Sequence, residues 1–229
     1  MSGSWLLTGA SVIGPGHVLE GLPNQDAFLN RQISGGFLSV VCDGMGSKPH
    51  SHLGSRLACR AIHDVIRSAD FLIDSQSLVE SIYGHWLTLL DGLPQKDAVT
   101  TCLICWGNAS GSIRYFQLGD GRIVAPVQLF EGGDSYFSNE TTGLGVSASF
   151  SDWRTGKFEL DRGQCIAVMT DGISDDLELG CENDLLAALI RSLKGKSPRR
   201  GKKTLAVDLH EWPTPNHLDD KTISVIVRL

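Results

Sequence analysis

The sequence predicts an α+β protein in which layered antiparallel β-sheets are covered by α-helices. Two observations support this fold class. Segments with strand-like and helical apolar patterns are grouped along the chain rather than alternating, which disfavours a doubly wound parallel sheet. Most strand-like segments are also separated by short turns that contain glycine, as antiparallel neighbours require. Because no fixed-period repeat and no linker divides the chain, we expect one domain over residues 1–229.

The first part of the chain contains three strand-like runs and then two helical runs. We expect strands at 4–13, 26–33 and 36–42, with a turn at 14–17. Their spacing suits a meander of adjacent antiparallel strands, whose ends would bring Asp26 and Asp43 close together. Apolar residues then recur at helical spacing, which predicts helices. These helices should occupy residues 51–69 and 75–90.

The remainder of the chain returns to strands and closes on one. The expected strands are 99–106, 112–118, 122–129, 153–160, 165–170 and 221–229, and the expected helices are 182–193 and a short one at 205–209. The basic segment 194–203 also contains Gly and Pro, so we interpret it as a solvated loop. A docking surface for an acidic partner is the less favoured alternative.

Composition excludes several classes of function. The 229 residues carry a net charge of −6, which argues against nucleic-acid binding as the main activity. No apolar run is long enough to span a membrane, and the chain starts without a signal-peptide pattern. The six cysteines stand mostly in apolar contexts and fit buried thiols in a reducing cytoplasm.

Five strand-like segments are each bordered by an aspartate. These residues are Asp26, Asp43, Asp120, Asp171 and Asp219, and several are followed by glycine. One Asp-Gly beside a strand is usually only a turn, but five strand-bordering aspartates in one chain weaken that explanation. If the strands converge, these carboxylates could share two ions, and hard oxygen ligands favour Mg²⁺ or Mn²⁺ over zinc. Such a pair of ions can hold a phosphate and activate the hydroxide between them for hydrolysis.

The motifs that contain these aspartates resemble those of a known family. In order they are Asn-Gln-Asp-Ala at 24–27, Val-Cys-Asp-Gly-Met-Gly at 41–46, Leu-Gly-Asp-Gly-Arg at 118–122, Thr-Asp-Gly-Ile-Ser-Asp at 170–175 and Asp-Asp-Lys-Thr at 219–222. They resemble the metal-dependent serine/threonine phosphatases of type 2C, most closely the compact bacterial branch. Each motif alone is weak, whereas their order and spacing are specific, and the resemblance runs from about residue 5 to the end.

The resemblance implies a fold and a catalytic centre. The fold would be two stacked antiparallel β-sheets flanked by α-helices on both faces, a four-layer α-β-β-α sandwich. Asp43 would bridge two metal ions, the carbonyl of Gly44 would ligate one of them, and Asp171 and Asp219 would complete the other. Asp43, together with Asp26, would be responsible for catalysis.

Further residues would surround this centre. By the same resemblance, Gln25 would support it directly or through water, and Asp120 and Asp175 match positions that hold a third, looser metal ion. A flap at about 128–140 would help to select substrates.

Three positions depart from the family pattern. Gly21 stands where an arginine usually holds the substrate phosphate, Gln25 replaces a glutamate, and Met45 replaces a histidine of the animal members. His17 and Lys48 are candidate replacements for the arginine. The alternatives are that His17 is an exposed loop histidine and Lys48 a solvated loop lysine.

The sequence therefore predicts a phosphatase that acts on phosphoserine and phosphothreonine in proteins and needs two Mn²⁺ or Mg²⁺ ions, with a possible third. A cognate serine/threonine kinase is an expected partner, and neither nucleic acid nor membrane is expected. The alternative is a catalytically weak or inactive phosphatase-like regulatory binding module, which Gly21 and Gln25 motivate. A metal-dependent nuclease is disfavoured by the acidic chain.

Overall fold

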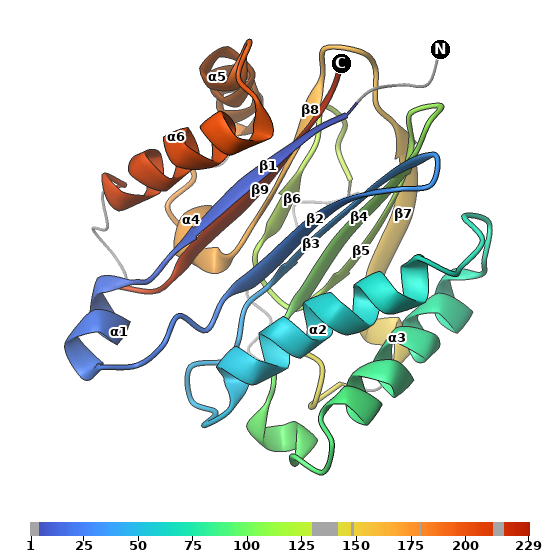
Figure 1. Ribbon diagram of the computed structural model, residues 1–229, viewed down its shortest axis with the longest axis vertical. Helices are drawn as coiled ribbons and strands as arrows, with labels where there is room; N and C mark the ends of the chain where they lie inside the picture. The colour runs from blue at the N-terminus through green and yellow to red at the C-terminus, as the bar shows by residue number, and fades with distance from the viewer. Residues whose placement is uncertain (1–4, 130–141, 148, 179, 213–217) are drawn as a thin grey trace.

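A computed structural model describes residues 5–129, 142–147, 149–178, 180–212 and 218–229. Two antiparallel β-sheets lie face to face, and a pair of helices covers the outer face of each (Figure 1). This arrangement confirms the predicted α-β-β-α sandwich. The expected flap lies almost wholly in 130–141, outside the described residues.

The first sheet has four strands in the order β1-β9-β8-β6. The strands are β1 (Trp5–Val12), β9 (Lys221–Arg228), β8 (Cys165–Met169) and β6 (Arg122–Val124). Strand β1 pairs with β9 along its whole length, from Trp5 opposite Arg228 to Val12 opposite Lys221. The expected meander of the first three strands was therefore wrong, because β1 pairs with the last strand of the chain and belongs to a different sheet from β2.

The second sheet has five strands in the order β2-β3-β4-β5-β7. The strands are β2 (Ala27–Ile33), β3 (Gly36–Cys42), β4 (Cys102–Asn108), β5 (Ser112–Leu118) and β7 (Arg154–Glu159). The β2–β3 hairpin pairs Ala27 with Cys42 at its open end. Asp26 and Asp43 are the next residues beyond that pair, so the prediction that they lie near one another is confirmed.

Four long helices form the outer layers. Helices α2 (Ser51–Ile66) and α3 (Ser75–Leu89) cover the second sheet, and α5 (Glu182–Leu193) and α6 (Pro198–His210) cover the first (Figure 1). The shorter elements are α1 (Pro15–Glu20), α4 (Asp171–Ser174) and the 3₁₀ turns η1 (Gln95–Asp97) and η2 (Phe150–Asp152). Among the described residues, no helix combines the length and the apolar character needed to cross a bilayer.

Two of these helices correct the sequence-based prediction. Most of the basic segment expected as a loop forms the first half of α6. This helix begins at Pro198 and is capped by Ser197, whose side chain accepts a hydrogen bond from the amide of Arg200. Burial of Leu205 and Leu209 against the first sheet stabilises the helix despite the cations in its first turns. Residues 14–17, expected as a simple turn, lead into and begin α1.

Three apolar clusters fill the spaces between the four layers. One lies between α2, α3 and the second sheet, one between α5, α6 and the first sheet, and one between the two sheets. Cys102 belongs to the first of these clusters and Cys105 to the one between the sheets. The two cysteines therefore lie on opposite faces of β4, and both are core residues, in agreement with the buried thiols expected from the sequence.

Replacing Trp86 with alanine should lower the free energy of unfolding by about 3–5 kcal/mol. Trp86 is fully buried in the helix-facing core, and its indole N–H donates to the carbonyl of Gly54 over 3.1 Å. Urea unfolding of the variant measures this loss. Leu87→Ala on the same helix is the matched control, since Leu87 is exposed and should cost little. Equal losses for the two variants would contradict the proposed position of Trp86.

Candidate metal centre

Four aspartates lie at converging strand ends. Asp26 precedes β2 and Asp43 follows β3, while Asp219 lies just before β9 and Asp171 follows β8 at the start of α4. In an antiparallel sheet the end of one strand and the start of its neighbour share an edge. The two stacked sheets therefore bring their acidic ends to the same side of the sandwich.

The backbone around Asp43 is fixed by two threonines that immediately precede β4. The amide of Asp43 donates to Thr101 Oγ1 over 2.9 Å, and its carbonyl accepts from the Thr101 amide at 2.7 Å and from Thr100 Oγ1 at 2.8 Å. Burial raises the pKa of Asp43 well above its usual range, and the carboxylates of Asp26 and Asp171 raise it further.

Asp26 is the most deeply buried of these carboxylates. Thr170 Oγ1 donates to its Oδ2 over 3.0 Å, whereas its Oδ1 has no partner among the described residues. Burial raises the pKa of Asp26 well above its usual range, the carboxylates of Asp220 and Asp171 add to this, and the hydroxyls of Thr222 and Thr170 oppose it. A buried carboxylate oxygen without a donor is costly, so the site has a strong demand for positive charge.

Asp219 and Asp120 extend the same negative field. Burial raises the pKa of Asp219, and the Asp171 carboxylate raises it further. Partial loss of hydration, followed by the charge of Asp171, raises the pKa of Asp120 to about 6. Asp175, at the end of α4, contributes to the shift at Asp120 and is itself exposed. All the aspartates named from the sequence therefore interact electrostatically in one region.

Gly44 and Gln25 lie beside these carboxylates. The amide of Gly44 donates to the Gln25 carbonyl over 3.2 Å. A Cβ at Gly44 would come within 2.8 Å of that carbonyl and 2.7 Å of Ser51, so only glycine permits this close approach. The side-chain oxygen of Gln25 is buried and has no hydrogen-bond partner among the described residues, which leaves it available to water or an ion.

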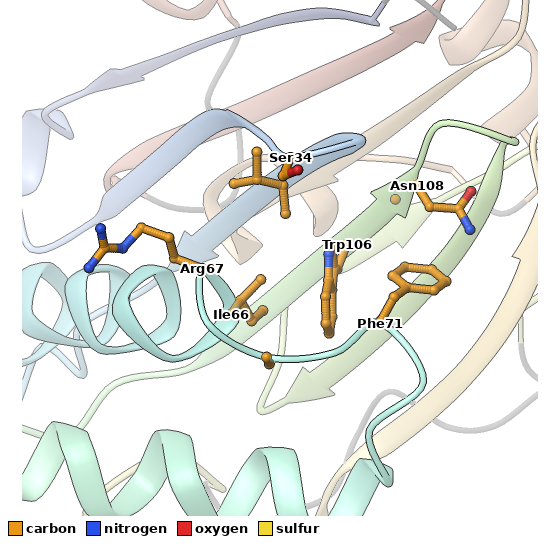
Figure 2. Close-up of a pocket in the computed structure, with 9 residues that line it drawn as sticks. Ser34, Ile66, Arg67, Phe71, Trp106 and Asn108 are labelled. Atoms are coloured by element: carbon orange, nitrogen blue, oxygen red, sulfur yellow. The ribbon is translucent and has the colours of Figure 1, made fainter. Parts of the chain in front are cut away.

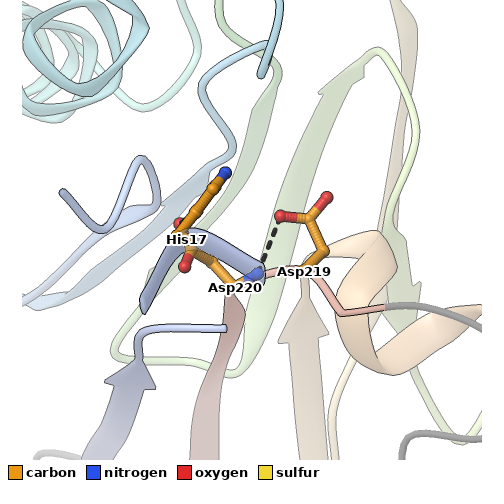
Figure 3. Close-up of side chains that lie close together, drawn as sticks. All are labelled: His17, Asp219 and Asp220. Carbon is orange, nitrogen blue, oxygen red and sulfur yellow. Dashed lines mark hydrogen bonds and ion pairs between the residues drawn. The ribbon is translucent and has the colours of Figure 1, made fainter. Parts of the chain in front are cut away.

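His17 lies next to Asp219 and Asp220 (Figure 3). Its Nδ1 is 2.9 Å from Asp220 Oδ2, and only 13% of the His17 side chain is exposed. Asp220 also accepts from the amide of Gly14 at 2.7 Å and from that of Gln25 at 2.6 Å. The adjacent Asp219 carboxylate accepts from the Asp220 amide at 2.7 Å (Figure 3). His17 therefore lies in α1 with its side chain mostly buried against Asp220, and it is not an exposed loop histidine.

Lys48 and Gly21 occupy different sides of the centre. Lys48 lies in the turn between Asp43 and α2, and its amide donates to the Met45 carbonyl over 2.9 Å. Gly21 ends α1 with a left-handed backbone, φ +68°, and the amide of Leu22 donates to the His17 carbonyl over 2.9 Å. Glycine is the residue best suited to this helix end, which explains why no arginine stands at this position.

The donor set fits divalent cations. Carboxylates that raise one another's pKa need a cation, and aspartate and carbonyl oxygens are the ligands that Mg²⁺ and Mn²⁺ prefer. Single atoms of His17, Asp219 and Asp220 also lie within 4.8 Å of one another. Two backbone amides already donate to the Asp220 carboxylate, which leaves this group fewer free ligand atoms for an ion.

Sequence reasoning missed three residues that build this centre. The Asp220 carboxylate accepts hydrogen bonds from the amide of Gly14, just before α1, and from the amide of Gln25, just before Asp26. The hydroxyl of Thr170 donates to Asp26 and accepts from the amide of Thr222. The Asp-Asp doublet before the last strand was the available signal for Asp220. The threonine contacts run between strands that are distant in sequence, and nothing local indicates them.

A separate small pocket lies at the opposite end of the second sheet (Figure 2). Its volume is about 120 Å³, and it is lined by Ile33, Ser34, Ile66, Arg67, Ala69, Phe71, Trp106, Gly107 and Asn108. Ile33 ends β2, whereas Asp26 precedes its start, so a strand of seven residues, about 20 Å, separates this pocket from the acidic centre. The pocket is therefore not part of that centre.

Comparison with known proteins identifies the family. The family model described as protein phosphatase 2C matches residues 13–212, which include almost all of the motifs above. The chain belongs to the protein phosphatase 2C family. This confirms the resemblance and the class of enzyme that it implies, a metal-dependent serine/threonine protein phosphatase. A search of curated proteins found no significant match.

Several solved structures share the fold at low sequence identity. The PP2C phosphatase domain of SpoIIE from Bacillus subtilis, with a fragment of its regulatory domain, superposes with a TM-score of 0.64 and 17% identity. That match covers 99% of this chain and 63% of the SpoIIE chain, so this chain spans less than two thirds of that relative.

Two further structures match over nearly the full length of both chains. The serine/threonine phosphatase of S. agalactiae gives a TM-score of 0.69 at 17% identity, with coverage of 99% and 100%. RsbX in complex with magnesium gives 0.64 at 16% identity, with coverage of 98% and 96%. At these identities the likeness establishes the shared fold.

The metal-free protein should become less stable as the pH rises through about 6. Raised pKa values at Asp26 and Asp120 mean that the folded state binds protons that the unfolded chain, with carboxyl pKa values of about 4, has already released. Stability is therefore lost between these two limits as the carboxyls ionise in the folded state. Thermal unfolding in chelator across this range measures the slope.

Asp26→Asn is the control for that measurement. It removes one buried charge, so it should raise the melting temperature of the metal-free protein near neutral pH and flatten the slope. Added Mn²⁺ should stabilise the wild type most at the highest pH tested. A stability that rises with pH in chelator would show that repulsion among these carboxylates does not dominate.

Proposed function

We propose that this chain hydrolyses phosphoserine and phosphothreonine in proteins with the aid of two Mn²⁺ or Mg²⁺ ions. The carboxylates of Asp43, Asp171 and Asp219 and the carbonyl of Gly44 would hold the ions. The observation that carries the proposal is the convergence of the strand ends that bear Asp26, Asp43, Asp171 and Asp219, together with the pKa of Asp43, which burial and these carboxylates raise. When bound, such ions supply positive charge to the phosphate and lower the pKa of water.

The surrounding residues would prepare the site. Asp26 and Gln25 each have a buried oxygen without a partner among the described residues, which suits contact with the ions or their water ligands. Thr170 holds the other oxygen of Asp26 and so fixes the orientation of that carboxylate. Asp120 and Asp175 would hold a third ion, in keeping with their mutual electrostatic influence at the edge of the site.

His17 and Lys48 are the candidate groups for the substrate phosphate. His17 Nδ1 lies 2.9 Å from Asp220 Oδ2, so Nε2 is the ring nitrogen that would face a substrate anion. Lys48 offers a positive charge from the turn that follows Asp43. A cation near the phosphate is needed because Gly21 provides none.

The inactive-module alternative has less support. A binding module without catalysis has no need for buried carboxylates that repel one another, and these cost stability. We further propose that residues 1–229 form one domain and that the enzyme opposes a serine/threonine kinase. The six cysteines are free and mostly buried, in keeping with a reducing cytoplasm.

Asp43→Asn should abolish turnover and leave the fold intact. The substitution removes the charge of the proposed bridging ligand while keeping the shape of the side chain, so loss of activity should exceed a factor of about 1,000. Phosphate release from a phosphothreonine peptide with Mn²⁺ measures it, with chelator as the control for the wild type. Wild-type rates in this variant would exclude Asp43 as a metal ligand.

His17→Gln should weaken phosphate binding by about 10-fold if His17 contacts the phosphate, which corresponds to about 1.4 kcal/mol for a charge-assisted hydrogen bond. The measurements are the KM for para-nitrophenyl phosphate and the inhibition constant of inorganic phosphate. Lys48→Gln tests the other candidate in the same assays. A lower melting temperature with unchanged constants would assign His17 a structural role only.

A further inference from the structure

Helix α1 is a short excursion from the sandwich that buries almost nothing. None of its six residues is buried. Its position depends on polar contacts: the amide of Gly14 donates to Asp220 Oδ1, and the amide of Gly16 donates to the Leu218 carbonyl over 2.9 Å. Since burial of apolar surface is what usually stabilises a helix in a protein, this helix is exceptional.

The helix nevertheless presents large apolar side chains to solvent. Leu19 is 82% exposed and Val18 59%, while Leu22, just after the helix, is 36% exposed and Leu218 is 51% exposed. Four of the eleven exposed large hydrophobic side chains in the described part of the chain therefore belong to this small region. Single exposed leucines are ordinary, but a group of them indicates a surface that binds something.

These four residues belong to one small region of the fold. Val18 and Leu22 are four residues apart, and the helix end brings the amide of Leu22 back to the His17 carbonyl. Leu218 packs beside Gly16, where a Cβ would lie 3.2 Å from the Leu218 Cβ. Gly16 and Leu19 are three residues apart and so share a face of the helix. We call this group, Val18, Leu19, Leu22 and Leu218, the apolar rim.

The apolar rim consists of two chain segments, and each is adjacent in sequence to a residue of the candidate metal centre. Val18 follows His17, which pairs with Asp220, and Leu218 immediately precedes Asp219. A phosphoryl group at the centre therefore places the residues that flank it within reach of this surface. Besides His17, helix α1 carries one charged side chain, the exposed Glu20. A single charge gives this surface little electrostatic selectivity, so its apolar side chains are the feature that a partner would recognise.

We propose that the apolar rim is a docking surface for apolar residues that flank the phosphorylated serine or threonine of the protein substrate. This inference rests on the proposed function and deepens it, because it names the class of substrate sequence that the enzyme prefers. The occupant follows from continuity, since the rim borders the place where the phosphoryl group must bind.

Hydrolysis of two sets of phosphothreonine peptides with Mn²⁺ tests the proposal. The sets are equal in length and net charge and carry either leucine and valine or serine and glycine beside the phosphothreonine. We expect wild-type kcat/KM to be about 10-fold higher for the apolar set. The double variant Val18→Ser with Leu19→Ser should lose that preference, with its rates normalised to its own hydrolysis of para-nitrophenyl phosphate.

Leu72→Ser is the matched control. Leu72 is also 82% exposed, but it lies in the connection between α2 and α3, beside the Phe71 that lines the distant pocket. This variant should keep the wild-type preference between the peptide sets. All three substituted side chains are exposed, so the melting temperature of each variant should stay near that of the wild type and loss of folding would not account for a change in preference.

Several outcomes would overturn the inference. Equal kcat/KM of the wild type for the two peptide sets would do so, as would an equal loss of preference in the Leu72→Ser variant. Concentration-dependent dimerisation of the wild type that the double variant abolishes would make the rim an interface between copies of this chain. Failure of the wild type to hydrolyse any peptide or para-nitrophenyl phosphate with Mn²⁺ would instead refute the proposed function.

Discussion

Repulsion between carboxylates at converging strand ends is the constraint on which the rest of the structure depends. Burial and the charges of nearby carboxylates raise the pKa values of Asp26, Asp43 and Asp219. The fold contains this repulsion by attaching the aspartates to strands that are paired along much of their length and packed on three apolar clusters. The packed sheets and helices thus stabilise the protein, whereas the acidic strand ends destabilise it, as is usual for a protein with a charged functional site.

A buried lysine partly offsets the negative charge from within, whereas the neighbouring Asp220 adds to it. The Asp220 carboxylate raises the pKa of Asp26 and Asp219, and it also accepts hydrogen bonds from the amides of Gly14 and Gln25. Lys221 follows it in sequence, is buried, and donates from Nζ to the Asp219 carbonyl over 3.1 Å. Burial lowers the pKa of Lys221, and the carboxylates of Asp176 and Asp219 counteract this.

Local patterns predicted most of the elements but not all of their partners. Strands β3 and β5 and helix α5 begin and end at the residues expected from periodicity, because each combines a clear apolar pattern with clear boundaries. The pairing of β1 with β9 joins the two ends of the chain, and no local pattern carries that information. Helix α6 was underestimated because the basic residues of its first turns hid the apolar stripe that Leu205 and Leu209 continue.

For the candidate site, too, the sequence predicted the functional residues but not the contacts that hold them. Repetition of an aspartate beside a strand was visible in the sequence, and the structure brings those aspartates into one electrostatic field. The hydrogen bonds that orient them were not visible, because Thr170 and Asp220 act across strands on Asp26 and Gln25. A sequence can show which groups are costly to bury, but the donors that make the burial tolerable depend on the register of strands that are distant along the chain.

Helix α1 shows how a departure from the family pattern changes the edge of the site. The left-handed backbone at Gly21 closes the helix, and so the position that usually supplies a cation cannot carry one without strain. The same helix places His17 against Asp220 and turns Val18 and Leu19 outward. Because Asp220 also holds the amide of Gln25, the contacts that fix α1 also fix the residue before Asp26. The same buried carboxylate therefore holds the start of α1 and the residue before Asp26.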